Sequence, residues 1–136
     1  KGLRLYAWVI MSNHVHLSAE AVEGFKLQDI IRDLKKFTSK QVLKAIAEHP
    51  GEGRRLWMLQ IFRDAGEANS NNKDHQFWQQ HNKPIELFSN GMIGRYMNYL
   101  HENPEKSGYV EHAEDYVYCT APAIAGKPVL LKLEEL

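Results

Sequence analysis

The chain has 136 residues, of which 43% are hydrophobic and 25% are charged, and its formal net charge is zero. These values are ordinary for a globular protein and predict one domain over residues 1–136 with a modest core. We expect no membrane partner, no internal disulfide and a cytoplasmic location, because no apolar run approaches about 20 residues, Cys119 is the single cysteine, and no signal peptide is recognisable.

Two strands open the predicted fold. The segment from Leu3 to Met11 alternates between two faces and is rich in aromatic and branched side chains, which is typical of a strand. Ser12 and Asn13 supply turn chemistry. Residues 14–20 are then predicted to form a second strand that runs antiparallel to the first.

The segment from Leu27 to about Glu48 has the apolar period of an amphipathic helix. Although the whole chain is neutral, residues 26–44 hold six basic and two acidic residues, a local charge of +4. A basic helix face can follow a phosphate backbone, whereas the plainer interpretation is a solvated surface. The predicted phosphate contacts on this helix are Arg32, Lys35, Lys36 and Lys40.

The second half of the chain is predicted to be less regular. A second helix is expected from Arg54 to about Phe62, although the run LWMLQIF also fits a buried strand. Ser89 is the expected N-cap of a further helix, which Pro104 should end near Asn103. Short strands are expected at residues 76–80, 85–88 and 129–133.

The tripeptide His14-Val15-His16 begins the second predicted strand. Because side chains alternate along a strand, the two histidines point to the same face. Neighbouring imidazoles can each give a nitrogen to one metal ion. Since such a pair is more often structural than metal-binding, this interpretation depends on further ligands elsewhere in the chain.

Tyr99 and Asn103 are the candidates for the rest of the site. On the predicted helix they lie four residues apart and therefore share one face. If that face packs beside the histidine strand, Asn103 offers an amide oxygen as a third ligand and Tyr99 presents a phenol oxygen beside the same ion. Such donors leave room for phosphate oxygens, which suits Mg²⁺ or Mn²⁺. Tyr96 is a competing candidate, but its neighbour one turn later is Leu100, which cannot ligate a metal.

Four blocks of sequence, in this order, carry a resemblance to a known family: YAWVIMSNHVHL, RDLKKFTSKQ, QFWQQHNKPIEL, and YLHENPEKSGYV with EDYVYCTA. From Leu3 to Leu131 the chain resembles the single-tyrosine HUH transposases, and among them the REP-associated tyrosine transposases with their IS200-like domain. The resemblance implies an α/β (α+β) ferredoxin-like fold, with a central antiparallel sheet and helices packed on one face.

The resemblance also implies roles for the site residues. His14 and His16 match the family's metal-binding histidines, Asn103 matches its polar metal ligand, and Tyr99 matches its catalytic tyrosine. Such enzymes cut single-stranded DNA beside hairpins: the tyrosine attacks phosphorus, forms a 5′-phosphotyrosine link and frees a 3′-hydroxyl, so religation needs no ATP. The implied cofactor is Mg²⁺ or Mn²⁺, the implied partner is hairpin-containing single-stranded DNA, and a homodimer is a further expectation.

The sequence departs from the family pattern in two places. Ser12 stands where relatives usually have proline, an exchange that a turn tolerates. Relatives also usually begin with a further strand and helix, so the resemblance implies a chain that is truncated at its N-terminus. A missing strand leaves a sheet edge that a partner chain can cover.

Three alternative functions remain at the level of sequence. A histidine-triad nucleotide hydrolase needs a third histidine where this chain has Ser18. A catalytically inactive, transposase-derived module that binds DNA hairpins is the main alternative to an active enzyme. A zinc-structured scaffold lacks a fourth soft ligand at a suitable spacing.

Overall fold

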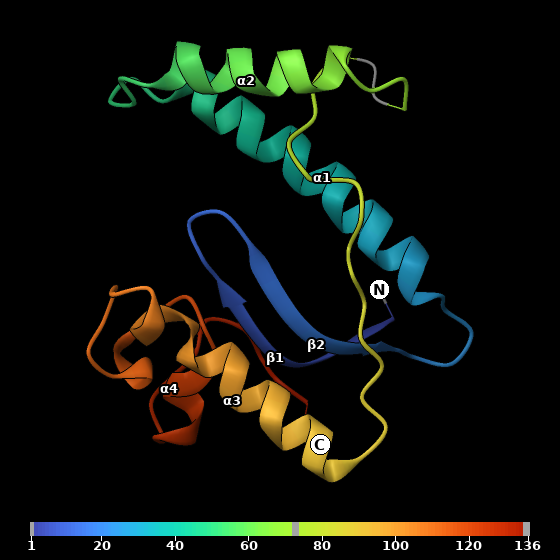
Figure 1. The fold of residues 1–136 in the computed structure, drawn as a ribbon, viewed down its shortest axis with the longest axis vertical. Coiled ribbons are helices and arrows are strands. Elements are labelled where there is room, and N and C mark those ends of the chain that lie inside the picture. Colours follow the sequence, from blue (N-terminus) through green and yellow to red (C-terminus); the bar gives the residue numbers. More distant parts are fainter. Residues whose placement is uncertain (1, 72–73, 135–136) are drawn as a thin grey trace. The chain divides into compact units, whose positions relative to one another are not determined.

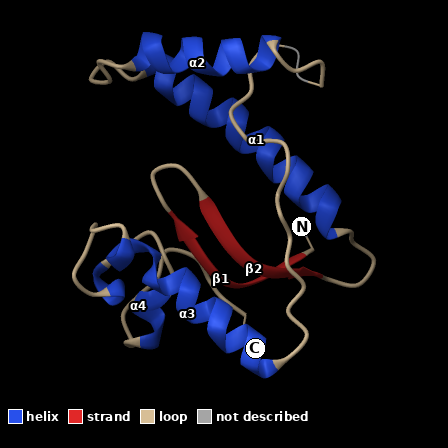
Figure 2. Cartoon of the chain, viewed as in Figure 1, coloured by secondary structure: helices blue, strands red, loops and turns tan. Residues whose placement is uncertain are grey.

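The structure is a computed structural model that describes residues 2–71 and 74–134. Its contacts divide the chain into two compact units, Lys1–Leu27 with Ile85–Leu136, and Gln28–Pro84. The α+β class expected from the sequence is confirmed, since helices accompany an antiparallel two-stranded sheet. The elements, drawn in Figures 1 and 2, are β1 (Leu3–Ile10), β2 (Val15–Ala21), α1 (Leu27–Glu48), α2 (Arg55–Glu67), α3 (Asn90–Lys106), the 3-10 helix η1 (Ala113–Asp115) and α4 (Ala121–Ile124).

The β1–β2 hairpin forms as predicted. The strands are antiparallel, with Val9 opposite His16 and Ile10 opposite Val15. Beyond the paired residues, the backbone N–H of Met11 donates to the carbonyl of His14 at 2.8 Å, so the ladder continues to the turn. His14 therefore lies at the entrance of β2 rather than within it, two residues before His16.

The core of the first unit lies between β1 and α3. Ala7, Val9 and Met11 alternate along the first strand segment and are buried together with Leu100 of α3. A strand directs every second side chain to one face, so these three residues give α3 a continuous apolar surface to pack against. Because Leu100 follows Tyr99 directly, the same packing fixes the helix that carries both Tyr99 and Asn103.

The C-terminal segment runs along the other edge of β1. The N–H of Thr120 donates to the carbonyl of Trp8 at 3.0 Å, and the N–H of Ile10 donates to the carbonyl of Tyr118 at 2.9 Å. Residues 129–133 form no strand, so that prediction is wrong: the chain bends at Leu130 and Leu131, whose side chains are exposed. The short helices η1 and α4 were not predicted, because elements of three and four residues show no apolar period.

The second unit consists of α1, α2 and the segment that follows them. The α1 bounds agree with the sequence prediction, while α2 is a helix and not the alternative strand, and it continues to Glu67. No residue of α1 is buried. The unit contains no helix that is long and apolar enough to cross a membrane, and the same holds for all other described residues.

Residues 76–80 form no strand, so that prediction is also wrong. They use their polar groups to join the two helices instead: the indole N–H of Trp78 donates to Thr38 Oγ1 at 2.9 Å, and Lys35 Nζ donates to the carbonyl of Gln79 at 2.6 Å. The N–H of Gln76 donates to the carbonyl of Phe62 at 2.8 Å. In Figure 1 this yellow-green segment leaves the end of α2 and passes beside α1.

Residues 85–88 also form no strand, contrary to the sequence prediction. The side chains of Ile85 and Phe88 are exposed, so this apolar run finds neither a core nor a neighbouring strand among the described residues.

Helix α3 begins as predicted but ends later than predicted. Ser89 caps its start by accepting a hydrogen bond from the N–H of Met92 at 3.3 Å. The helix then continues through Pro104 to Lys106. Proline lacks the N–H that would serve the carbonyl of Leu100, and Asn103 Nδ2 donates to that carbonyl at 3.4 Å instead.

Candidate functional site

The fold of the first unit brings together the four residues predicted to form the site. His14 and His16 stand at the start of β2 with ring centroids 4.9 Å apart. Tyr99 of α3 lies beside the second histidine, its ring centroid 5.5 Å from that of His16. Asn103 lies beside the first, with Oδ1 3.3 Å from His14 Nε2. Residues up to 89 positions apart in sequence thus meet in one place.

Both ring nitrogens of His14 face amide oxygens. Nδ1 lies 2.7 Å from Oδ1 of Asn13, and Nε2 lies 3.3 Å from Oδ1 of Asn103. Amide oxygens only accept hydrogen bonds. The ring can therefore satisfy both oxygens with two protons, or with one proton on Nδ1 and a cation shared by Nε2 and Asn103. In either case a proton or a cation lies between Nε2 and Oδ1 of Asn103.

Asn103 is held in the orientation that this requires. Its Nδ2 donates to the carbonyl of Tyr99 at 2.8 Å and to the carbonyl of Leu100 at 3.4 Å. The amide nitrogen is thus occupied on the helix, and Oδ1 is the atom directed at His14.

His16 and Tyr99 complete the cluster. Burial, and then the neighbouring His14, lower the pKa of His16 below its ordinary value, which favours the neutral ring that can donate a lone pair. Tyr99 is 48% exposed, and its hydroxyl forms no hydrogen bond with a described residue. Tyr99 is therefore a half-exposed residue that is open to solvent.

These donors fit a divalent cation of intermediate hardness. Imidazole nitrogens favour transition-metal ions, the amide oxygen is a donor that Mn²⁺ and Mg²⁺ accept, and the set leaves coordination positions for further oxygen ligands. Within residues 2–71 and 74–134, no group of three or more histidine, cysteine, aspartate or glutamate side chains is arranged to hold a metal. The candidate site is the histidine–asparagine cluster, whose third donor is an amide oxygen.

Side chains around the hairpin turn support the cluster, and sequence reasoning missed their roles. Tyr109, after α3, donates its hydroxyl to Ser12 Oγ at 2.8 Å. Tyr116 donates its hydroxyl to the carbonyl of Ile10 at 2.8 Å. The sequence predicts only a turn role for Asn13, although its position directly before the first histidine is a signal for contact with that ring.

The four basic residues predicted to contact phosphate lie on α1, in the second unit, and are not part of this cluster. Arg32 is engaged with Asp29 at 2.6 Å and with Asp33 at 3.1 Å. Lys35 donates to the carbonyl of Gln79 and to the side chain of Asn82, and burial lowers its pKa. Lys36 and Lys40 are exposed, and neither forms an ion pair with a described residue. Their contact with DNA stays a prediction.

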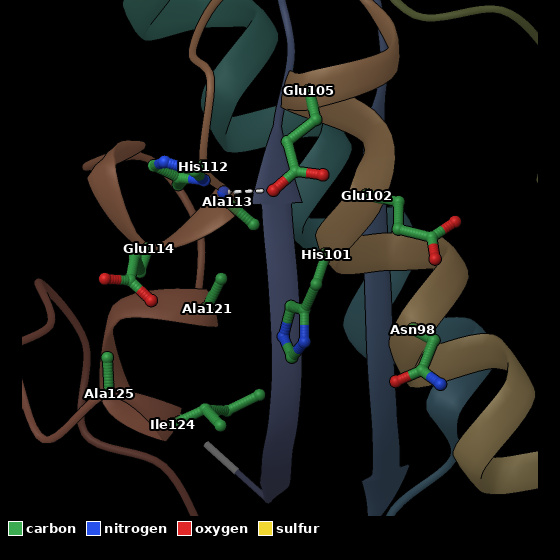
Figure 3. Close-up of a pocket in the computed structure, with 10 residues that line it drawn as sticks. All are labelled: Asn98, His101, Glu102, Glu105, His112, Ala113, Glu114, Ala121, Ile124 and Ala125. Atoms are coloured by element: carbon green, nitrogen blue, oxygen red, sulfur yellow. Dashed lines mark hydrogen bonds between the residues drawn. The ribbon is translucent and has the colours of Figure 1, made fainter.

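A separate cavity of about 380 Å³ lies among α3, η1 and α4 (Figure 3). Three glutamates line it, but each already has a partner: Glu102 pairs with Lys106, Glu105 accepts from the N–H of Ala113, and Glu114 pairs with Lys127. His101, which also lines it, is held through Nε2 by Thr120 Oγ1 at 2.9 Å. Neither Tyr99 nor Asn103 lines this cavity, so it is separate from the histidine–asparagine cluster.

A family model described as "Transposase IS200 like" matches residues 1–73, more than half of the chain. The matched segment contains the β1–β2 hairpin with both histidines and the helices α1 and α2, and it ends before α3. Neither a curated protein nor a solved structure matches the chain significantly.

Proposed function

The chain belongs to the family of IS200-like transposases, and on this premise we propose that it cuts and rejoins single-stranded DNA beside hairpins with Tyr99 as the nucleophile. Family membership makes DNA the partner and transposition the process. The finer assignment of mechanism and substrate is our proposal, and it builds on the cluster of His14, His16, Tyr99 and Asn103.

One observation carries the proposal. The exposed phenol of Tyr99 lies beside His16, while Asn103 on the same helix face lies against His14. The family match ends before α3, so it contributes nothing to this meeting. A nucleophile beside a cation-attracting pair of histidines is the arrangement that phosphodiester cleavage through a covalent intermediate needs.

In the proposed reaction the Tyr99 hydroxyl oxygen attacks the phosphorus of a DNA phosphodiester. The new bond joins the phenol oxygen to phosphorus, the bond from phosphorus to the 3′ oxygen breaks, and that oxygen leaves as a 3′-hydroxyl after taking up a proton. Because the phosphotyrosine preserves the energy of the original ester, a 3′-hydroxyl can later attack it and restore a DNA strand without ATP.

His14, His16 and Asn103 would hold Mg²⁺ or Mn²⁺ for this reaction. Such an ion, when bound, neutralises negative charge on the phosphate and makes the phosphorus easier to attack. The protein's own contribution is to position the donors on a rigid strand and a rigid helix, and to present the phenol oxygen from the exposed side of α3.

The test is covalent trapping of labelled DNA. The chain is incubated with Mn²⁺ and a single-stranded oligonucleotide that carries a hairpin, and the products are separated on a denaturing gel. We expect a protein–DNA adduct that carries the label only when the label lies on the 3′ side of the cut, because a 5′-phosphotyrosine link keeps that fragment attached to the protein. Tyr99→Phe should abolish the adduct.

Tyr96→Phe is the matched control, because it removes a hydroxyl from the same helix and should leave the adduct unchanged. An adduct that persists in Tyr99→Phe contradicts the choice of nucleophile. Hairpin binding without an adduct in the unmodified chain contradicts catalysis and favours the alternative, an inactive module that binds DNA hairpins.

A further inference from the structure

Asn13 contacts the first histidine through the ring nitrogen that faces away from Asn103. Its Oδ1 lies 2.7 Å from His14 Nδ1, whereas Asn103 Oδ1 lies 3.3 Å from His14 Nε2. Each oxygen can only accept, and a neutral imidazole carries one proton. That proton can serve one oxygen, and the shorter contact, to Asn13, is the stronger hydrogen bond.

Asn103, on the Nε2 side of the His14 ring, does not offer a donor that would favour the other tautomer. Asn103 would have to turn its amide over to present a donor to Nε2, but its Nδ2 already donates to the carbonyls of Tyr99 and Leu100. One of these carbonyls, that of Leu100, lacks its ordinary helical donor, because Pro104 has no N–H. Turning the amide would therefore leave polar groups of α3 unsatisfied.

We infer that Asn13 is a positioning residue that keeps the proton of the neutral His14 ring on Nδ1 and leaves the Nε2 lone pair facing Asn103 Oδ1. The two acceptor atoms then share one space that a cation can enter. A hydrogen bond to the nitrogen that does not bind the metal is how proteins generally fix the tautomer and orientation of a ligating histidine. The inference rests on the proposed function for the identity of the cation, and on the geometry alone for the tautomer.

The tautomer can be read directly from long-range ¹H–¹⁵N correlation spectra of the imidazole rings. The spectra are recorded without metal or DNA, at a pH where the rings carry one proton. We expect the Nδ1–H pattern for His14 in the unmodified chain. In Asn13→Ala the oxygen of Asn103 becomes the remaining acceptor, so the pattern should change to Nε2–H. Asn13→Asp keeps an acceptor oxygen and should restore Nδ1–H.

His16 provides an internal control, because its ring does not contact Asn13 and its pattern should be the same in all three proteins. An Nε2–H pattern for His14 in the unmodified chain overturns the inference, and so does an unchanged Nδ1–H pattern in Asn13→Ala. The first of these outcomes needs no variant, so the test holds even if a substitution impairs folding.

A second measurement connects the tautomer to cation binding. Titration calorimetry with Mn²⁺ should give an affinity about 10-fold weaker for Asn13→Ala, since a proton then occupies the ligating nitrogen, and an affinity at least equal to the original for Asn13→Asp. Equal affinities for Asn13→Ala and the unmodified chain contradict the role in cation binding. Because neither measurement involves DNA cleavage, absence of a phosphotyrosine adduct would reject the proposed function without affecting the tautomer.

Discussion

The side-chain amide of Asn103 contacts His14 through its oxygen and the backbone of its own helix through its nitrogen. Its Oδ1 lies 3.3 Å from His14 Nε2, and its Nδ2 donates to the carbonyls of Tyr99 and Leu100. The helical carbonyl exposed by Pro104 thereby helps to orient the amide toward the histidine. The Asn-Pro pair is thus a structural part of the candidate site as well as a break in the helical pattern.

The two functions of Asn103 should separate in substitutions. Asn103→Asp keeps an oxygen for a cation but replaces the donor with a second oxygen facing two carbonyls. We expect chemical denaturation to show a free energy of unfolding lower by about 1 kcal/mol, the usual net value of a hydrogen bond. Mn²⁺ affinity measured by calorimetry should be preserved or increased, because a carboxylate is a better ligand than an amide.

Asn103→Ala removes both ends of the amide and is the companion variant. It should lose a similar amount of stability and should also bind Mn²⁺ more weakly than Asn103→Asp does. If the two variants bind Mn²⁺ equally well, the oxygen of Asn103 is not a ligand, and its role is confined to the helix.

The parts of this fold that the sequence predicts are those in which one period dominates. The alternation of β1 matches its buried face, and the apolar repeat of α1 predicts the bounds of this helix, although none of its residues is buried. The alternation also places His14 and His16 on one face, and helical spacing places Tyr99 and Asn103 on another. What spacing alone cannot provide is the contact between these two faces, which depends on Leu100 packing against β1.

Two of the predictions that failed concern segments held by hydrogen bonds that a rule about strand composition or about proline does not consider. Residues 76–80 have strand-like composition, but Trp78 and Gln79 bond to α1 rather than to a neighbouring strand. The proline rule predicts that α3 ends near Asn103, because proline normally stops a helix, but this rule does not consider the Asn103 side chain, which donates to the Leu100 carbonyl. In both cases a tertiary or side-chain hydrogen bond outweighed the local preference.

Neighbouring lysines of α1 should behave differently in DNA binding. Lys36 is exposed and has no ion-pair partner among the described residues, so its ammonium group is free to contact phosphate. In Lys36→Ala we expect the slope of log affinity against log salt concentration for single-stranded DNA to fall by about 0.7, the value for one phosphate contact. Fluorescence anisotropy across a salt series measures this slope.

Lys35→Ala is the matched comparison, one residue away on the same helix. Lys35 donates to the Gln79 carbonyl at 2.6 Å and to Asn82 Oδ1 at 2.9 Å, so it holds the segment after α2 in place. Its removal should lower the free energy of unfolding by about 1.5 kcal/mol, as for a hydrogen bond from a charged donor, and should change the salt slope less than Lys36→Ala does. The reverse ranking of the two variants would show that Lys35 leaves its internal partners to bind DNA.

Ser12 and Tyr109 provide the last prediction, at the turn before the histidines. Ser12 occupies the position where the resembling transposases usually have proline, and its hydroxyl accepts a hydrogen bond of 2.8 Å from Tyr109. Serine does not restrict the backbone as proline does, but its hydrogen bond with Tyr109 connects the turn to the chain after α3.

Ser12→Ala and Tyr109→Phe should each lower the free energy of unfolding by about 0.5 to 1 kcal/mol, because the bond is exposed. The double variant should lose less than the two single losses combined, with a coupling of about 0.5 kcal/mol measured by urea denaturation. Strictly additive losses would mean that the two hydroxyls act independently, and the turn would then owe its position to the backbone ladder between Met11 and His14 alone.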